Sequence, residues 1–222
     1  MIRPAMQPMF ITFEGIDFSG KSTQIRILER RLRDRGERVL LVREPGGTVI
    51  SENIRSILLD RAHEAMDDVT EFLLFSASRS QLVQEEIIPA LDAGVHVIAD
   101  RFHDSSTAYQ GYGRGIDIRA IESVHRIATH GIVPDLTFFI DIPVDASFER
   151  RNKPERAIDR MEAADRAFFE RIRDGYLHLA REHASRFVRI DAVLPIDHIA
   201  NTIWNTIGSR LSSSEDASRA TP

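Results

Sequence analysis

Lys21 draws attention first, because only two of the chain's 29 basic side chains are lysines. It lies in GIDFSGKS, residues 15–22, which satisfies the pattern G-x-x-x-x-G-K-[ST]. In this pattern glycines let backbone N–H groups surround phosphate oxygens, lysine reaches the β- and γ-phosphates, and the serine hydroxyl can bind Mg²⁺. The segment therefore predicts a nucleoside triphosphate site with Lys21 as a catalytic cation. The predicted phosphate-binding residues are Gly15, Ile16, Asp17, Phe18, Ser19, Gly20, Lys21, Ser22 and Thr23.

A carboxylate that could help to organise the metal follows a short apolar segment. Asp100 closes the segment 95–99, VHVIA, which has the composition of a buried strand. Phosphate-loop enzymes hold Mg²⁺ with the serine of the loop and an acidic residue at the end of a neighbouring strand. We therefore expect Ser22 and Asp100 to form a magnesium site, partly through water and nucleotide phosphates.

Arginines cluster where a second anion could bind. Arg43, Arg55 and Arg101 lie near the predicted site, and four more lie between residues 150 and 160. A phosphate monoester is mostly dianionic at pH 7, so it needs cations rather than a general base. The planar, permanently charged guanidinium suits that task. The supply of arginine therefore favours a kinase that acts on a nucleoside monophosphate.

Two other classes of function remain open at this point. A kinase for a nucleoside hydroxyl would need a general base, which Glu44 could supply. A nucleotide-dependent switch would carry N-K-x-D after a strand, whereas this chain has NKPE at 152–155 within an arginine-rich segment.

Short β-rich segments alternate with segments of helical periodicity, which predicts an α/β fold with a parallel sheet covered on both faces. Ligands of such sheets bind beyond the carboxyl ends of the strands, where polar loops follow residues 16, 43 and 100. The predicted strands span 9–16, 38–43, 95–100, 135–141 and 186–191. The predicted helices span 21–35, 48–59, 67–92, 117–130, 145–151, 163–183 and 195–211.

Composition limits the class of protein further. The net charge of −5 argues against nonspecific binding to nucleic acid, and no apolar run approaches the roughly 20 residues of a membrane helix. The absence of cysteine excludes disulfides and fits a cytoplasmic location. We expect a flexible N-terminal extension (1–8), a single domain (9–211) and a disordered tail (212–222).

Several sequence blocks together resemble the thymidylate kinase family, in its bacterial form. They are FEGIDFSGKSTQ (13–24), REPGGT (43–48), LLFSASR (73–79), DRFHDSSTAYQGYGRG (100–115), PDLTFFID (134–141) and DRME (159–162). The resemblance implies the P-loop kinase fold with a five-stranded parallel sheet. It also implies ATP- and Mg²⁺-dependent phosphorylation of dTMP to dTDP, for dTTP biosynthesis, by a homodimer.

The resemblance also implies a dTMP site. In the family, the residue matching Phe75 stacks on thymine and the one matching Arg79 donates to its O4. Arginines matching Arg55 and Arg101 hold the phosphate of dTMP. The remaining matches are Tyr109 against a ribose 2′-OH, Ser106 and Gln110 near the base, and Asp17 and Glu44 near the sugar and the bridged phosphates.

Phe18 departs from the family pattern, which has a small residue or an arginine at this position. Phenylalanine cannot supply a cation to the phosphates, so the resemblance assigns this task to a lid at about 148–162. Within that segment Arg156 and Arg160 lie beyond Pro154. We expect these two arginines to be catalytic together with Lys21 and Arg101.

Overall fold

The computed structural model describes residues 7–152 and 159–219, and side chains up to residue 210. Its sheet has five parallel strands in the order β2-β3-β1-β4-β5, which confirms the predicted α/β fold class. The register places Ile11 of the central strand between Ile98 and Leu136. The strands are β1 (Phe10–Glu14), β2 (Val39–Arg43), β3 (His96–Asp100), β4 (Leu136–Asp141) and β5 (Phe187–Asp191).

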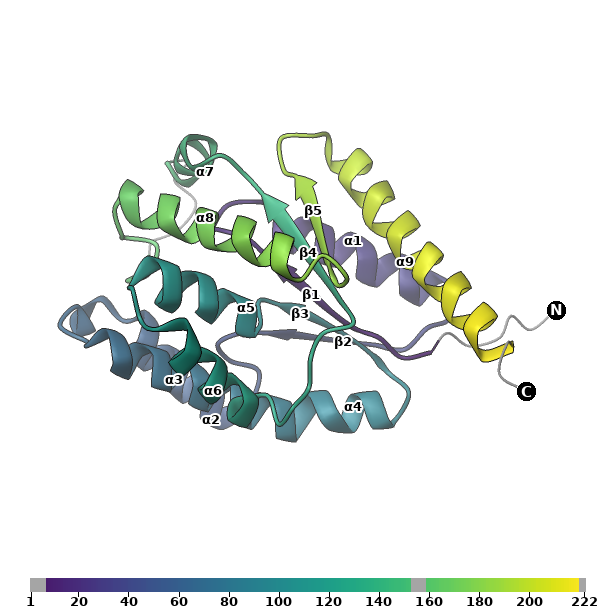
Figure 1. Cartoon of the computed structure of the whole chain (residues 1–222), viewed down its shortest axis with the longest axis horizontal. Coiled ribbons are helices and arrows are strands. Elements are labelled where there is room, and N and C mark those ends of the chain that lie inside the picture. Colours follow the sequence, from purple (N-terminus) through teal and green to yellow (C-terminus); the bar gives the residue numbers. More distant parts are fainter. Residues whose placement is uncertain (1–6, 153–158, 220–222) are drawn as a thin grey trace.

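Helices cover both faces of this sheet (Figure 1). α1 and α9 pack against each other on one face, while α8 packs against η3, β4 and β5 on the other. The helices of the described chain are α1 (Lys21–Asp34), α2 (Val49–Leu59), η1 (Arg61–His63), α3 (Asp68–Leu82), η2 (Val83–Ile87), α4 (Ile88–Asp92), α5 (His103–Ser106), η3 (Thr107–Gly113), α6 (Ile118–Ala128), α7 (Val144–Arg151), α8 (Arg166–Glu182) and α9 (Ile196–Arg219).

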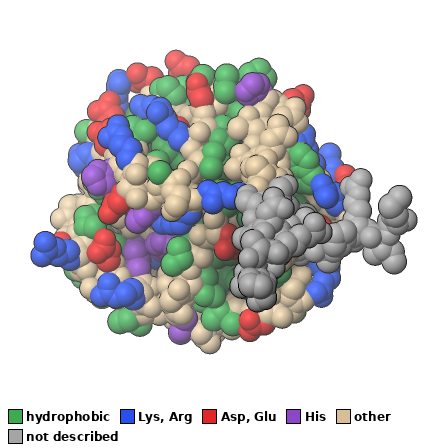
Figure 2. All heavy atoms as spheres, turned by 45° about the vertical axis from the view of Figure 1, so that its right-hand side comes forward, with side chains coloured by type: hydrophobic (Ala, Val, Ile, Leu, Met, Phe, Trp, Pro, Cys, Tyr) green, Lys and Arg blue, Asp and Glu red, His purple; other side chains and the backbone are tan. Residues whose placement is uncertain are grey.

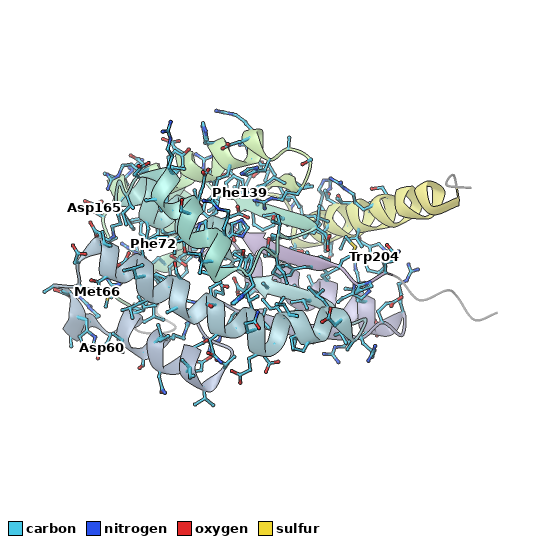
Figure 3. The ribbon with its side chains drawn as sticks, turned by 60° about the horizontal axis from the view of Figure 1, so that its bottom comes forward. Asp60, Met66, Phe72, Phe139, Asp165 and Trp204 are labelled. Carbon is cyan, nitrogen blue, oxygen red and sulfur yellow. The ribbon has the colours of Figure 1, made fainter. Side chains whose placement is uncertain are left out.

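Aromatic side chains fill the core on each side of the sheet. Phe13 of β1 meets Phe138 of β4, with ring centroids 5.3 Å apart. The next residue, Phe139, points to the opposite face, as strand alternation requires, and stacks on Tyr176 of α8 at 5.2 Å. Figure 3 labels Phe139 inside the molecule and Trp204 on α9. Aromatic packing on both faces thus holds the sheet in place, and with it the carboxyl ends of its strands.

One predicted loop is wrong. The polar segment after residue 100 is helical from His103 to Gly113, and its second part, η3, is a π-helix. Gly111 and Gly113 allow close packing here. A Cβ at Gly111 would lie 2.6 Å from Ile118 Cδ1, and a Cβ at Gly113 would lie 2.8 Å from Phe168. The polar side chains point inward, towards partners that the sequence alone does not show.

The ends of the chain also differ from expectation. α9 continues to Arg219, past the predicted end at residue 211, so residues 212–219 of the predicted disordered tail are helical. Residues 1–6 and 220–222 lie outside the described residues, as does the segment 153–158 of the predicted lid. No described helix is both long and apolar enough to cross a membrane.

Charged side chains are mixed over the surface that Figure 2 shows. Lys and Arg side chains lie there among Asp, Glu and apolar ones and form no continuous basic band on this face.

Candidate active site

The phosphate loop connects β1 to α1 and begins in a position that only glycine fits. A Cβ at Gly15 would lie 2.5 Å from the carbonyl oxygen of Ile140, and its φ is +136°. Phe18 adopts a φ of +59°, a left-handed conformation that costs about 1–2 kcal/mol for a residue with a side chain. Gly20 caps the N-terminus of α1 with a φ of +100°. The loop therefore aims backbone N–H groups and a helix N-terminus at one point, which suits an anion.

The Lys21 side chain is buried. Its Nζ donates to the carbonyl oxygens of Gly15 at 3.1 Å and Ile16 at 3.0 Å. Burial, followed by the charge of Arg101, lowers the pKa of Lys21 to about 8. The ammonium group is still mostly protonated at pH 7, and the loop holds it in place.

Ser22 and Asp100 are brought together as predicted for a metal site. The Ser22 hydroxyl donates to Asp100 Oδ2 at 3.1 Å, so the loop serine and the strand-end carboxylate face the same point. Mg²⁺ in kinases needs only one or two protein oxygens, because phosphates and water complete its octahedron. These two oxygens fit that requirement, although no described group of three or more His, Cys, Asp or Glu residues could hold a metal alone.

A cavity of about 670 Å³ opens beside the loop, at the carboxyl ends of β1, β2 and β3. Every residue predicted for the dTMP site lines it. The phosphate-loop residues 17–23 and Asp100 line it too, whereas Gly15 and Ile16 lie behind the wall with their carbonyl oxygens bound to Lys21. The predicted dTMP residues on the wall are Asp17, Glu44, Arg55, Phe75, Arg79, Arg101, Ser106, Tyr109 and Gln110.

Arg101 is the centre of a hydrogen-bond network on one wall of the cavity. Its guanidinium donates to Asp17 at 2.6 Å, to Tyr109 at 3.0 Å and to the Gly15 carbonyl at 2.8 Å. Tyr109 in turn donates to Asp17 at 3.0 Å. Burial opposes ionisation of Asp17, but the charges of Arg101 and Lys21 outweigh it, so the pKa of Asp17 lies below its ordinary value. The network fixes three predicted site residues with respect to the phosphate loop.

Arg79 and Glu44 form a buried ion pair on another wall. Their closest atoms, Nη2 and Oε2, are 2.6 Å apart, and the side chains are 1% and 3% exposed. Arg79 also donates through Nη2 to the Ser106 hydroxyl at 3.0 Å. Arg79 Nη1 and Glu44 Oε1 are buried and have no hydrogen-bond partner among the described residues. Because a buried, unpartnered charged donor is costly, Nη1 is poised to donate to a ligand.

Arg55 supplies a cation near the mouth of the cavity. It donates to the carbonyl oxygen of Pro45 at 2.7 Å, and Arg43 lies beside it in an ion pair with Glu52. Burial, together with the charge of Arg43, lowers the pKa of Arg55. Glu52 neutralises Arg43, whereas the side-chain hydrogen bond of Arg55 goes to an uncharged carbonyl oxygen, so the Arg55 guanidinium is suited to an acceptor phosphate.

Of the two lid arginines predicted to be catalytic, the structure describes one. Arg156 lies outside the described residues, and Arg160 is buried away from the cavity wall, with Nη2 2.7 Å from Glu71 Oε2. Arg150 of α7 lines the cavity instead and donates to the carbonyl oxygens of Phe18 at 3.2 Å and Ser19 at 3.3 Å. Helical spacing in the sequence does not show that α7 reaches the phosphate loop.

Further residues line the wall besides those predicted to bind nucleotide. Arg43, which the sequence placed near the site, is the last residue of β2 and lies on the wall. Ser105 also lines the cavity, but it lies in the segment that was predicted to be a loop. None of the others was assigned a role from the sequence, although four of them lie in the REPGGT and DRME blocks. They are Pro45, Leu59, Asp159, Met161 and Glu162.

The fold is a parallel α/β sheet with a phosphate loop. Beside that loop lie the Ser22–Asp100 pair, which is suited to Mg²⁺, and a cavity lined by arginines. Together these features define a P-loop kinase of the class that phosphorylates nucleotides. Comparison with known proteins narrows the class. The family model "Thymidylate kinase" matches residues 13–203. The chain belongs to the thymidylate kinase family, whose members are phosphotransferases, and this membership favours the monophosphate kinase over the nucleoside kinase and the switch.

Individual relatives agree over nearly their whole length. A thymidylate kinase of Chlorobaculum parvum is 45% identical over 207 residues, which is 90% of this chain and 95% of that protein. One of Trichlorobacter lovleyi is 46% identical, over 91% of this chain and 98% of its own. The crystal structure of thymidylate kinase from Ehrlichia chaffeensis superposes with a TM-score of 0.73 at 34% identity, covering 92% of this chain and 99% of that one.

Proposed function

We propose that the enzyme transfers the γ-phosphoryl group of ATP to dTMP, giving dTDP, and that it does so with Mg²⁺ in the cytoplasm. The single observation that carries this proposal is the joint placement of the phosphate loop and the predicted dTMP residues on one cavity of about 670 Å³. Donor and acceptor sites that share a cavity allow an in-line transfer without a covalent intermediate.

The acceptor base would lie between Phe75 and Arg79. Both line the cavity and belong to α3, where residues four apart share a face of the helix. Arg79 Nη1, which has no partner among the described residues, would donate to O4 of thymine. Cytosine presents an amino group at this position, so two donors would face each other there, a mismatch of about 1–3 kcal/mol.

The acceptor phosphate would meet Arg55 and Arg101, while ATP would occupy the phosphate loop with Lys21 near its β- and γ-phosphates. Ser22 and Asp100 would hold Mg²⁺, which supplies charge neutralisation on the phosphates when bound. No general base is required, because the attacking phosphate is already ionised at pH 7. The work of the protein is to position two polyanions and to offset their repulsion.

The family resemblance suggests a homodimer, and exposed apolar side chains on two adjacent helices support this part of the proposal. Val49 and Ile50 of α2 are 78% and 52% exposed, and Val69 and Leu73 of α3 are 51% and 50% exposed. α2 and α3 pack against each other, so their side chains can form one surface for a second copy. Light scattering should give twice the mass of the chain, and Leu73→Glu should lower it towards the monomer.

An acceptor panel with ATP·Mg²⁺ tests the proposed substrate. dTMP should be phosphorylated faster than dCMP, AMP and UMP, and Arg55→Gln should raise the KM for dTMP at least tenfold while ATP affinity changes little. The matched control is Arg61→Gln, an exposed arginine close to the end of α2 whose ion pair with Glu64 lies outside the cavity. If the two variants affected dTMP equally, Arg55 would not hold the acceptor phosphate.

A further inference from the structure

Glu71 of α3 links the end of the predicted lid to the wall of the cavity. Its side chain is completely buried, accepts hydrogen bonds from two residues and forms an ion pair with a third. Oε2 lies 2.7 Å from Arg160 Nη2, at the end of the predicted lid, and 3.1 Å from Arg114 Nη2. Oε1 accepts from Gln110 Nε2 at 2.9 Å and from Arg114 Nε at 3.3 Å. One carboxylate therefore neutralises two guanidiniums and also binds an amide of the cavity wall.

The bond to Glu71 determines which atom Gln110 presents to the cavity. A glutamine amide has a donor nitrogen and an acceptor oxygen on opposite sides, and either orientation fits the same space. Because Nε2 of Gln110 points to Glu71, its carbonyl oxygen is the atom on the other side, towards the cavity that Gln110 lines. An acceptor there matches the N3–H of thymine, whereas cytosine has a lone pair at N3.

The Gln110 amide cannot turn its oxygen towards Glu71, because a carboxylate only accepts hydrogen bonds. Arg114 and Arg160 hold the carboxylate in place, and Arg160 is itself tied to α2 through the carbonyl oxygen of Leu58 at 2.8 Å. α3, which carries the carboxylate, and η3, which carries Gln110, pack directly against each other. The orientation of the amide is thus fixed by charged side chains that do not line the cavity.

We propose that Glu71 is a positioning residue for base choice, which orients the Gln110 amide so that the site accepts a base with a hydrogen at N3 and disfavours one with a lone pair there. This inference rests on the proposed place of Gln110 in the acceptor site. Glu71 lies one residue before Phe72, which Figure 3 labels, on the helix that also carries Phe75 and Arg79.

Glu71→Gln gives a sharp test, because it preserves shape and removes the charge. The new amide must turn its oxygen towards Arg114 and Arg160, since two guanidiniums demand an acceptor. Its nitrogen then faces Gln110, whose amide turns over and presents Nε2 to the cavity. We expect kcat/KM for dTMP to fall and that for dCMP to rise, so that their ratio drops at least tenfold.

Asp68→Asn is the matched control. It makes the same chemical change one turn earlier on α3 and touches the same Arg114, with Nε and Oδ1 3.2 Å apart, but Asp68 has no bond to Gln110 among the described contacts. It should leave the ratio of dTMP to dCMP within twofold of the wild type. If Glu71→Gln does not fold, Glu71→Gln/Arg114→Gln removes one charge of each sign and should show the same drop.

Gln110→Leu distinguishes the contact of Gln110 with the base from the orienting role of Glu71. If this variant leaves the ratio unchanged, Gln110 does not contact the base and its proposed place in the site fails. If Gln110→Leu lowers the ratio but folded Glu71→Gln does not, the placement of Gln110 stands and the role of Glu71 is overturned. A loss of activity towards both nucleotides by the same factor in Glu71→Gln would also overturn it.

Discussion

Removing the guanidinium of Arg79 should have two separable effects, one on stability and one on base choice. Arg79 and Glu44 are a fully buried pair, 2.6 Å apart, so Arg79→Met leaves an uncompensated carboxylate in the core. Breaking a buried pair in this way costs about 3–5 kcal/mol. Adding Glu44→Gln removes the stranded charge, and we expect the double variant to recover most of the lost stability.

The pH dependence of this loss follows from Glu44. Burial already raises the pKa of Glu44 despite the opposing charge of Arg79, and loss of Arg79 must raise it further. In the single variant the folded state then binds a proton that the unfolded state has released, since an unfolded glutamate titrates near pH 4.3. Stability must therefore fall as pH rises from 6 to 8, by up to ~1.4 kcal/mol per pH unit. Glu44→Gln should abolish this slope.

The same variants test the base site. A hydrogen bond from a charged donor contributes about 1.5–3 kcal/mol, which is about a tenfold to hundredfold effect on affinity. In Arg79→Met/Glu44→Gln, the Kd for dTMP should rise by that factor and the preference for dTMP over dCMP should narrow. Urea unfolding at pH 6, 7 and 8 and titration calorimetry provide the measurements. A stable Arg79→Met without a pH slope, or an unchanged dTMP preference in the double variant, would refute this reasoning.

Three further predictions concern the phosphate loop, the lid and the core. Lys21→Met should lower kcat by a factor of about 10² or more in steady-state assays, because the phosphates lose a preorganised cation; near-wild-type turnover of the folded variant would contradict the assignment of the loop. Arg150→Gln should raise the KM for ATP more than the KM for dTMP, because Arg150 donates to two carbonyl oxygens of the phosphate loop. Arg160→Gln should mainly lower the Tm, because Arg160 is in a buried ion pair with Glu71. The reverse pattern would show that Arg160 supplies the lid's cation to the phosphates. Burial holds the pKa of His125 far below its ordinary value. As pH falls below about 6.5, the unfolded state therefore takes up a proton that the folded state does not, and stability is lost. His125→Gln should make the decline in stability between pH 6.5 and 5 shallower by up to ~1.4 kcal/mol per pH unit, and an equal slope would show that His125 titrates normally.

The parts of the fold that follow from local patterns were predictable. The phosphate loop, the five strands and the helical segments depend on periodicity and on glycine positions, which are visible in the sequence. The helical segment from His103 to Gly113 was missed for a physical reason. Its serines and its glutamine look solvent-facing, but they bind Glu14, Arg79 and Glu71, which lie far away along the chain.

Charge pairing was harder to predict than secondary structure. The sequence indicated that arginines gather near the site, and the resemblance named those expected to touch the substrate. It did not show that Arg79 pairs with Glu44 or that Arg160 pairs with Glu71, because ion pairs between distant segments leave no periodic signal. For the same reason the sequence did not indicate that Arg150 binds the phosphate loop or that Glu71 binds Gln110.

The acceptor itself tests the central claim most directly. Purified enzyme, ATP and Mg²⁺ should be incubated in parallel with dTMP and with thymidine, and the products followed by ³¹P NMR. The arrangement of Arg55, Arg101 and the phosphate loop predicts the paired resonances of dTDP from dTMP and no dTMP from thymidine. Formation of dTMP from thymidine, or release of ADP and inorganic phosphate without dTDP, would contradict it.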